Sequence, residues 1–217
     1  MNREALLMDY YKTLSAALGP SHWWPGDTPF EIAVGAILVQ NTNWKNVEKA
    51  IANLKDNGAL TVQGMRNFSI DELQDMIRPS GFFRIKSERL LNFLDFLEMN
   101  SAECITDLSE FETSELREML LSVKGIGPET ADSILLYALN KPSFVVDGYT
   151  RRIFNRHMLV HEDIDYHELQ SFFADVLTED VQLFNEFHAL LVKTAKEWCK
   201  KTNPDCKRCP LGKFLQS

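Results

Sequence analysis

Apolar side chains along this chain recur every three or four residues. The clearest stretch is marked by Trp44, Val47, Ile51 and Leu54. This spacing predicts an amphipathic helix, because positions three and four apart lie on one helical face. No stretch of the sequence shows the alternation of apolar and polar residues that marks a β-strand. The hydrophobic pattern therefore predicts an all-α fold.

Capping signals and apolar runs predict further helices. Residues 30–39 are apolar on nearly every face, which is typical of a buried central helix. Ser69 and Glu72 form a capping-box pattern at the start of another helix. Pro128, suited to a first helical turn, opens a helix that continues through 129–139. Because no linker-like stretch separates these helices, we expect two lobes that share one core.

Composition is that of an ordinary globular protein. Of the 217 residues, 45% are hydrophobic and 25% are charged, which suffices for a substantial core. The longest apolar runs are too short to span a bilayer. The first residues also lack the apolar core of a signal peptide. We therefore expect a cytoplasmic monomer that contacts no membrane.

The charge distribution is uneven. The net charge of −8 argues mildly against a nucleic-acid-binding protein, because phosphate neutralisation needs Lys and Arg. Residues 193–217, however, hold seven basic and two acidic residues, a net charge of +5. A second basic cluster consists of Arg151, Arg152 and Arg156. Such a tail can simply be solvated, so the charges permit DNA binding without requiring it.

A turn with two glycines separates two predicted helices. Gly125 and Gly127 lack a Cβ atom, so their backbone amides can approach a phosphate closely. The helix that begins at Pro128 directs its positive end toward the same place. A Gly-x-Gly turn can equally be a plain connection between helices. The longer pattern here, Leu-x-x-x-Gly-Ile-Gly-x-x-Thr-Ala, is much more specific.

This pattern, at residues 121–131, resembles the helix-hairpin-helix DNA glycosylase superfamily, the group of endonuclease III. The resemblance extends from about Trp23 to Cys209. It implies a two-lobed all-α glycosylase fold with a C-terminal cysteine loop, and double-stranded DNA with a damaged base as the partner. In this chain a six-helix lobe would span residues 30–133, with the helix-hairpin-helix at about 112–139. The second lobe would combine residues 1–29 with residues 134–198, and the cysteine loop with its basic tail would follow at 199–217. The resemblance also implies a hairpin that holds the DNA backbone, often through a bound monovalent cation. The candidate DNA contacts there are Lys124, Gly125 and Gly127.

Asp147 ends an apolar run, 20 residues after Gly127. In the family, a carboxylate in a Val-Asp-x-x-x-x-Arg context serves catalysis, and Asp147 matches that context. The resemblance implies that Asp147 stabilises the cationic sugar or helps to activate the nucleophile. Arg151, from the second basic cluster, is a candidate DNA contact. Asp147 also precedes a predicted helix, where aspartate is a favoured N-cap, and both roles are compatible.

Glu129 occupies the position at which endonuclease III has its nucleophilic lysine, the second residue after the second glycine. A glutamate cannot form a Schiff base. The resemblance therefore implies a monofunctional enzyme, in which water attacks C1′ and an abasic site remains without AP lyase cleavage. Glu129 is also an ordinary acid for a first helical turn, favoured there by the helix dipole.

Three tryptophans flank the predicted central helix. Trp23 and Trp24 stand with Pro25 before it, and Trp44 follows it. An extruded base needs a pocket that stacks it, and a cationic alkylpurine would gain about 0.5–2 kcal/mol from indole faces. Each tryptophan alone is more often a core residue. Three motifs in succession resemble the bacterial 3-methyladenine DNA glycosylase III branch, namely Trp-Trp-Pro at 23–25, Gln-Asn-Thr-x-Trp at 40–44 and Arg-Pro-Ser-Gly-Phe at 78–82. This resemblance implies alkylated purines as substrates.

Two other functions stay open at this point. The substrate of an endonuclease III-like enzyme could be another damaged base, such as an oxidised pyrimidine. The chain could also be a helix-hairpin-helix DNA-binding protein without catalysis, although Asp147 argues against that.

The same resemblance assigns contacts with the rest of the duplex. Gln40 would fill the gap that the flipped base leaves, and Phe82 would press on the opposite strand. Basic residues beside that loop could contact phosphate, namely Arg84, Lys86 and Arg89. Arg84 and Lys86 could equally be solvated charges at a helix start.

Three cysteines near the end of the chain have metal-site spacing. Cys199, Cys206 and Cys209 match the iron–sulfur loop of the family, but its fourth ligand would be residue 215, which is Leu215. His188 lies 11 residues before Cys199 on one predicted helix, too far to substitute. Three possibilities remain: a [4Fe–4S] cluster with a non-cysteine or exogenous fourth ligand, another metal such as zinc, or a decayed site.

Overall fold

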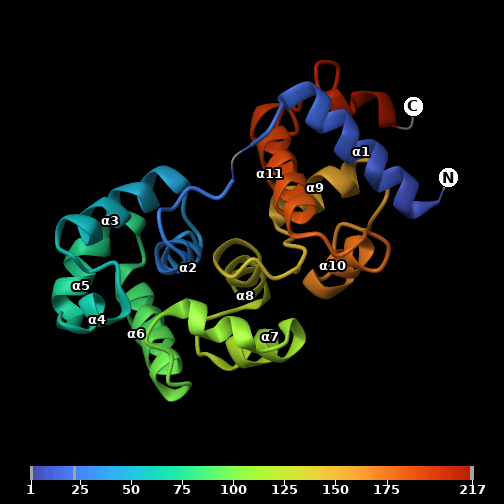
Figure 1. Cartoon of the computed structure of the whole chain (residues 1–217). Coiled ribbons are helices and arrows are strands. Elements are labelled where there is room, and N and C mark those ends of the chain that lie inside the picture. Colours follow the sequence, from blue (N-terminus) through green and yellow to red (C-terminus); the bar gives the residue numbers. More distant parts are fainter. Residues whose placement is uncertain (1, 22, 216–217) are drawn as a thin grey trace. The chain divides into compact units, whose positions relative to one another are not determined.

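The fold is all-α, as the hydrophobic pattern predicts. A computed structural model describes residues 2–21 and 23–215, and within these ranges every regular element is a helix (Figure 1). No helix among them is long and apolar enough to cross a membrane. The chain divides into two compact units. We call Pro25–Lys141 the inserted unit, and Met1–Trp24 together with Pro142–Ser217 the terminal unit.

The inserted unit is built around one buried helix. Its elements are α2 (Pro29–Leu38), α3 (Trp44–Asp56), α4 (Val62–Arg66), α5 (Ile70–Ile77), η1 (Arg78–Ser80), α6 (Phe83–Met99), η2 (Ile105–Glu110), α7 (Thr113–Ser122), α8 (Pro128–Ser133) and η3 (Ile134–Ala138). The central helix is α2, which packs against α3, α6, α8 and η3. Its residues are buried on nearly every face, since an apolar helix of this kind requires neighbours all round.

The inserted unit extends further than the sequence indicated. The expected boundary lay at residue 133, but the helix opened by Pro128 continues as a π-helical turn in η3. There Ile134 and Leu135 have no exposed surface and belong to the core around α2. The boundary therefore lies after Lys141, because the segment packs with the helix that precedes it.

The terminal unit brings together both ends of the chain. It contains α1 (Arg3–Leu18), α9 (Gly148–Arg156), α10 (Tyr166–Ala174), α11 (Val181–Glu197) and η4 (Pro210–Phe214). Helix α11 packs against α1 and α9, and η4 packs against α1. Stacked rings form its core, with the centroids of Phe144 and Phe173 4.3 Å apart. The cysteine loop belongs to this unit, where the rings of Phe214 and Tyr10 lie 4.4 Å apart.

Candidate active site

The hairpin between α7 and α8 contains two glycines in different surroundings, one crowded by a neighbouring side chain and one with free space beside it. Gly125 has φ +97°, and a Cβ atom there would lie 2.4 Å from Cγ of Arg89. Ile126 is buried and donates its backbone N–H to the Val123 carbonyl over 3.0 Å, so it fills the turn from inside. A Cβ atom at Gly127 would meet nothing within 4 Å. The hairpin is thus exposed at Gly127, where a phosphate was expected to approach.

Gln40 is hydrogen-bonded to this hairpin. Its Nε2 donates to the Gly125 carbonyl over 3.1 Å and to Thr130 Oγ1 over 2.8 Å. Its Oε1 accepts a hydrogen bond from Arg89 Nη1. The side chain that the sequence assigned to the gap in the duplex is therefore held against the hairpin by its amide nitrogen and against α6 by its amide oxygen. Its role in the duplex stays a prediction.

Helix α6 supports both the hairpin and the loop before it. Asn92 Nδ2 donates to the Lys124 carbonyl over 2.9 Å, so a second hairpin carbonyl is bonded internally. A monovalent cation at the hairpin stays a prediction. At the start of α6, Phe82 has φ +46° and 66% of its surface exposed, and it follows Gly81 with φ +68°. An exposed aromatic ring on left-handed backbone is available for contact with DNA.

The burial of Lys86 contradicts both of the roles predicted for it from the sequence. This lysine is neither a phosphate contact nor a solvated charge, because only 1% of its surface is exposed. Its Nζ donates to the carbonyls of Leu38 and Ser80, over 2.7 Å each. The signal that could have revealed this burial is helical: Lys86 lies four and seven positions before the buried Leu90 and Phe93. Arg84, in contrast, is exposed.

Asp147 caps α9 with one carboxylate oxygen. Its Oδ1 accepts hydrogen bonds from the Thr150 backbone N–H over 2.7 Å and from the Thr150 hydroxyl over 3.0 Å, which confirms the N-cap. Its Oδ2 lies 3.6 Å from Nε2 of His188, and 12% of the side chain is exposed. Burial raises the pKa of the Asp147 carboxyl, but the contacts with His188 and Thr150 outweigh this effect and hold the pKa below its ordinary value. Asp147 is therefore ionised at neutral pH.

His188 is a candidate site residue that the sequence did not reveal. It was considered only as a substitute metal ligand, whereas the structure places it on α11 beside Asp147. It is 4% exposed and lies among apolar neighbours such as Phe187. A histidine in that setting is usually an ordinary core residue. Its 41-residue separation from Asp147 left no local signal of the pair.

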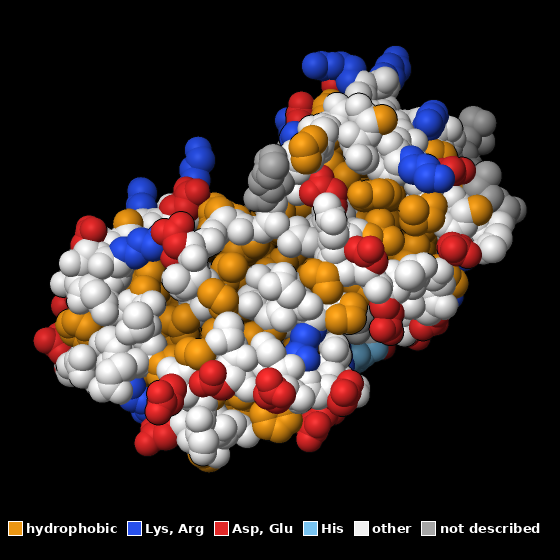
Figure 2. All heavy atoms as spheres, in the orientation of Figure 1, with side chains coloured by type: hydrophobic (Ala, Val, Ile, Leu, Met, Phe, Trp, Pro, Cys, Tyr) orange, Lys and Arg blue, Asp and Glu red, His pale blue; other side chains and the backbone are white. Residues whose placement is uncertain are grey.

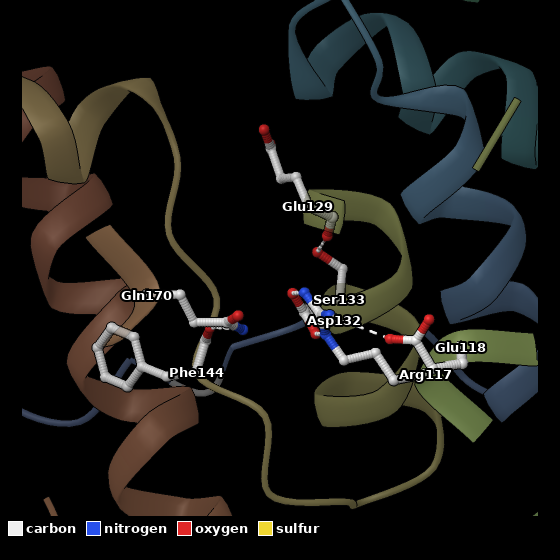
Figure 3. Close-up of polar contacts among 7 residues, drawn as sticks. All are labelled: Arg117, Glu118, Glu129, Asp132, Ser133, Phe144 and Gln170. Carbon is white, nitrogen blue, oxygen red and sulfur yellow. Dashed lines mark hydrogen bonds and ion pairs between the residues drawn. The ribbon is translucent and has the colours of Figure 1, made fainter. Parts of the chain in front are cut away.

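Glu129 lies in the first turn of α8 and is exposed. Its main-chain carbonyl accepts a hydrogen bond from Ser133 Oγ over 2.7 Å, while its carboxylate extends away from the helix (Figure 3). On the same helix, Asp132 is buried and accepts hydrogen bonds from Arg117 of α7 over 2.7 and 3.1 Å. This ion pair joins the two helices of the hairpin and thereby fixes the turn that presents Glu129.

Comparison with known proteins decides the family. Residues 34–179 match the family described as the HhH-GPD superfamily of base excision DNA repair proteins. A putative DNA repair glycosylase of Methanocaldococcus jannaschii is 42% identical over 218 residues, which cover 100% of this chain and 98% of that protein. The chain belongs to the HhH-GPD superfamily. It is accordingly a DNA N-glycosylase.

Two solved structures resemble this glycosylase. A 3-methyladenine DNA glycosylase of H. pylori, bound to 1,N6-ethenoadenine, shares 29% of its sequence with a TM-score of 0.76, covering 91% of this chain and 98% of the other. A non-covalent complex of endonuclease III with DNA gives a TM-score of 0.82 at 18% identity, covering 100% and 96%. The second likeness concerns the fold alone.

The tryptophans of the glycosylase are divided between the two units. Trp23 and Trp24 belong to the terminal unit, where their rings meet edge to face with centroids 5.5 Å apart. Trp23 also lines a groove of about 570 Å³ on α11, and Lys196 Nζ lies 5.9 Å from its ring centroid. Pro25, which is exposed, and Trp44, the half-buried first residue of α3, belong to the inserted unit.

Charged side chains of the glycosylase gather in patches. Figure 2 shows acidic side chains along the edge where α7 lies, and this helix carries exposed Glu115 and Glu118. Basic residues are exposed on the loop after α11, among them Lys200 and Lys201. Arg151, one turn after Asp147, is exposed too. The exposed charges therefore make the cysteine loop and the start of α9 electropositive, whereas α7 is electronegative.

The cysteine loop contains three thiols. Arg156 Nη1 donates to Cys199 Sγ over 2.8 Å. Burial raises the pKa of the Cys209 thiol, and the nearby Cys199 and Cys206 add to this effect. Leu215 has no donor atom in its side chain. Among the residues described, no three His, Cys, Asp or Glu side chains lie close enough to hold one metal ion. The match to the iron–sulfur loop of the family therefore rests on the spacing of the three cysteines, and a cluster stays a prediction.

Proposed function

We propose that this glycosylase is monofunctional and hydrolyses the N-glycosidic bond of alkylated purines, of the 3-methyladenine type, in duplex DNA. The observation that carries the proposal is Glu129, exposed in the first turn of α8 where endonuclease III has its lysine. A carboxylate cannot form an imine with the sugar, so the attack falls to water. Lys86 offers no replacement amine, because it is buried and bonded to two carbonyls.

Asp147 would supply the main electrostatic contribution. As the base departs, positive charge develops at C1′ of the sugar, and an ionised carboxylate stabilises that charge. Thr150 fixes Oδ1, so the carboxylate needs little reorganisation during the reaction. His188 beside Oδ2 acts as a positioning residue for Asp147. The same carboxylate can accept a proton from the attacking water.

The class of base is supported by two observations. Aromatic side chains at the predicted pocket positions include Trp23, Trp24 and Trp44, which suit a purine ring. The H. pylori relative at 29% identity is a 3-methyladenine DNA glycosylase bound to a modified adenine. An alkylated purine carries a positive charge and leaves readily, so little acid catalysis is required.

The decisive experiment combines base release with two tests of strand chemistry. Methylated duplex DNA is incubated with the protein, the free bases are identified, and strand breaks are measured with and without hot alkali. We expect 3-methyladenine or 7-methylguanine, with breaks after alkali only. Borohydride should trap no covalent adduct with the wild type. The Glu129→Lys variant supplies an amine and serves as the control in which an adduct can form.

The outcomes separate the parts of the proposal. Alkali-independent breaks or a trapped wild-type adduct would contradict the monofunctional mechanism. Release of an oxidised pyrimidine, and not of an alkylated purine, would retain the glycosylase and overturn the class of base.

We propose further that the cysteine loop binds a [4Fe–4S] cluster through Cys199, Cys206 and Cys209, with a fourth ligand that is not a cysteine. Such a cluster would stabilise the loop and hold its basic residues in place. The cluster is tested by purifying the protein anaerobically, measuring its iron and sulfide content and recording its visible absorption spectrum. We expect iron and a broad visible band, both lost in Cys199→Ala. Zinc, or no metal at all, would contradict the proposal.

A further inference from the structure

Lys86 joins two segments that are distant in the sequence. It lies in the first turns of α6, and its two acceptors are the last residues of α2 and of η1. The Leu38 carbonyl ends α2 and the Ser80 carbonyl ends η1, and each accepts a hydrogen bond of 2.7 Å. One buried ammonium group thus satisfies the unpaired carbonyls at two helix ends at once.

Each of these helix ends leads directly into backbone of unusual conformation. After Leu38 the chain continues to Gln40 and then to Asn41, which has φ +54°. After Ser80 it continues to Gly81 and Phe82, both with positive φ. Left-handed backbone at a non-glycine residue is strained, and it persists only where its surroundings fix it. The hydrogen bonds from Lys86 to the Leu38 and Ser80 carbonyls fix the backbone at the start of each segment.

Burial of a lysine side chain at this position costs free energy. Burial, together with the smaller effect of the neighbouring Arg89, lowers the pKa of Lys86 to about 8. Both hydrogen-bond acceptors are neutral carbonyls, which compensate a buried charge less well than a carboxylate does. A methionine would fill the same space without that cost. The ammonium is therefore retained for what it holds rather than for packing.

We infer that Lys86 is a positioning residue for base extrusion: it fixes the segments that carry Gln40 and Phe82 relative to each other, so that both can enter a duplex together. The inference rests on the proposed function, because it takes Gln40 and Phe82 as the side chains that replace the flipped base and press on the opposite strand. It adds a requirement, namely that the two segments act as one rigid unit.

Lys141 provides a matched control within the inserted unit. Its Nζ also donates to two backbone carbonyls, of Ser109 over 3.1 Å and of Phe111 over 2.6 Å. The Ser109 carbonyl lies near the end of η2 and the Phe111 carbonyl directly follows η2, away from Gln40 and Phe82 in the sequence. The variants Lys86→Met and Lys141→Met therefore remove the same kind of interaction, but only the first releases the two segments.

The test uses a duplex with a tetrahydrofuran abasic analogue in one strand and 2-aminopurine opposite it. Insertion of Gln40 and Phe82 unstacks the 2-aminopurine and raises its fluorescence. We expect Lys141→Met to give the wild-type signal at saturation, and Lys86→Met to reduce it about tenfold. Binding to undamaged duplex, followed by anisotropy, should change less than about twofold in both variants, because phosphate contacts carry it. Circular dichroism identifies a temperature at which all the proteins are folded.

The outcomes distinguish failure of this inference from failure of the proposed function. Equal signals from Lys86→Met and the wild type would overturn the positioning role of Lys86. Absence of a signal from the wild type would instead overturn the proposed insertion of Gln40 and Phe82. If Lys86→Met does not fold, Lys86→Gln replaces it, since glutamine keeps one donor group. A signal between those of the wild type and an unbound duplex is then expected, and a full wild-type signal would overturn the inference.

Discussion

Asp147 uses its two carboxylate oxygens for different purposes. Oδ1 is bonded to the backbone and hydroxyl of Thr150, whereas Oδ2 faces His188. Capping α9 and acting on a substrate therefore do not compete for the same atom. The sequence predicted the cap from the residue type and the helix that follows. It could not predict His188, because that contact depends on how two distant helices pack.

The first prediction separates capping from catalysis. Asparagine is as good an N-cap as aspartate, so Asp147→Asn should change the free energy of unfolding by less than about 0.5 kcal/mol. Loss of the charge should slow base release about 10²–10³-fold. Single-turnover release from methylated duplex measures the second effect, and urea unfolding measures the first. Asp165→Asn, at the N-cap of α10, is the control and should retain the wild-type rate.

The second prediction concerns His157, whose Nδ1 lies 2.7 Å from the Tyr10 hydroxyl in the core of the terminal unit. Burial lowers the pKa of His157 to about 4, and Arg156 contributes in the same direction. Between the unfolded value of about 6.5 and this value, the unfolded chain binds the extra proton. The free energy of unfolding should therefore decrease as pH falls through this window, by up to about 3 kcal/mol.

Urea unfolding across this pH range checks the effect. The variant His157→Gln lacks the titrating group, so its free energy of unfolding lacks this contribution. The wild type should therefore lose stability relative to the variant as pH falls. A difference that stays constant from neutral pH to pH 4 would show that His157 titrates normally.

At the scale of elements, local signals predicted the helices well. The capping box of Ser69 and Glu72 is present at the start of α5, and the spacing around Trp44 gives α3. These features depend on residues within four positions of one another. The two carbonyls that Lys86 bonds and the extent of the inserted unit to Lys141 depend on packing between distant segments, which no local pattern reveals.

The third prediction compares the two hairpin glycines. Gly125→Ala places a Cβ atom 2.4 Å from Arg89 on backbone with φ +97°, and should destabilise the protein by about 1–3 kcal/mol. Gly127→Ala meets no neighbour within 4 Å and should leave stability unchanged. It should nevertheless weaken DNA binding, because the methyl group obstructs a phosphate. Thermal unfolding and anisotropy measure the two effects, and undiminished DNA binding by Gly127→Ala would place the phosphate elsewhere.

At the scale of the whole molecule, the inserted unit interrupts the terminal unit in the sequence. The inserted unit is continuous in the sequence, and its main core is formed by its own residues, from Phe30 to Leu139. The terminal unit is assembled from both ends of the chain. The sequence predicted this arrangement in outline, because the family resemblance implied it.

The fourth prediction follows from the continuous core. A fragment of residues 25–141 should fold on its own, with helical circular dichroism and a cooperative thermal transition. It should release no base from methylated DNA, because Asp147 lies in the terminal unit. A fragment that melts without cooperativity would show that the inserted unit depends on the terminal unit for its stability.

Helix α1 packs against a helix that is synthesised late, α11. Its buried residues, Leu7, Tyr10 and Leu14, face a unit in which α11 is the principal partner. That partner begins more than 160 residues after α1 ends. At about 5–20 residues per second, a ribosome needs roughly 8–30 seconds to deliver it. The inserted unit is completed within this interval, once Lys141 has been added, whereas α1 lacks its principal partner until the interval ends. A nascent chain of this glycosylase therefore passes through a stage in which the inserted unit can fold while the apolar face of α1 still awaits α11, and this is the stage at which a chaperone would bind that face.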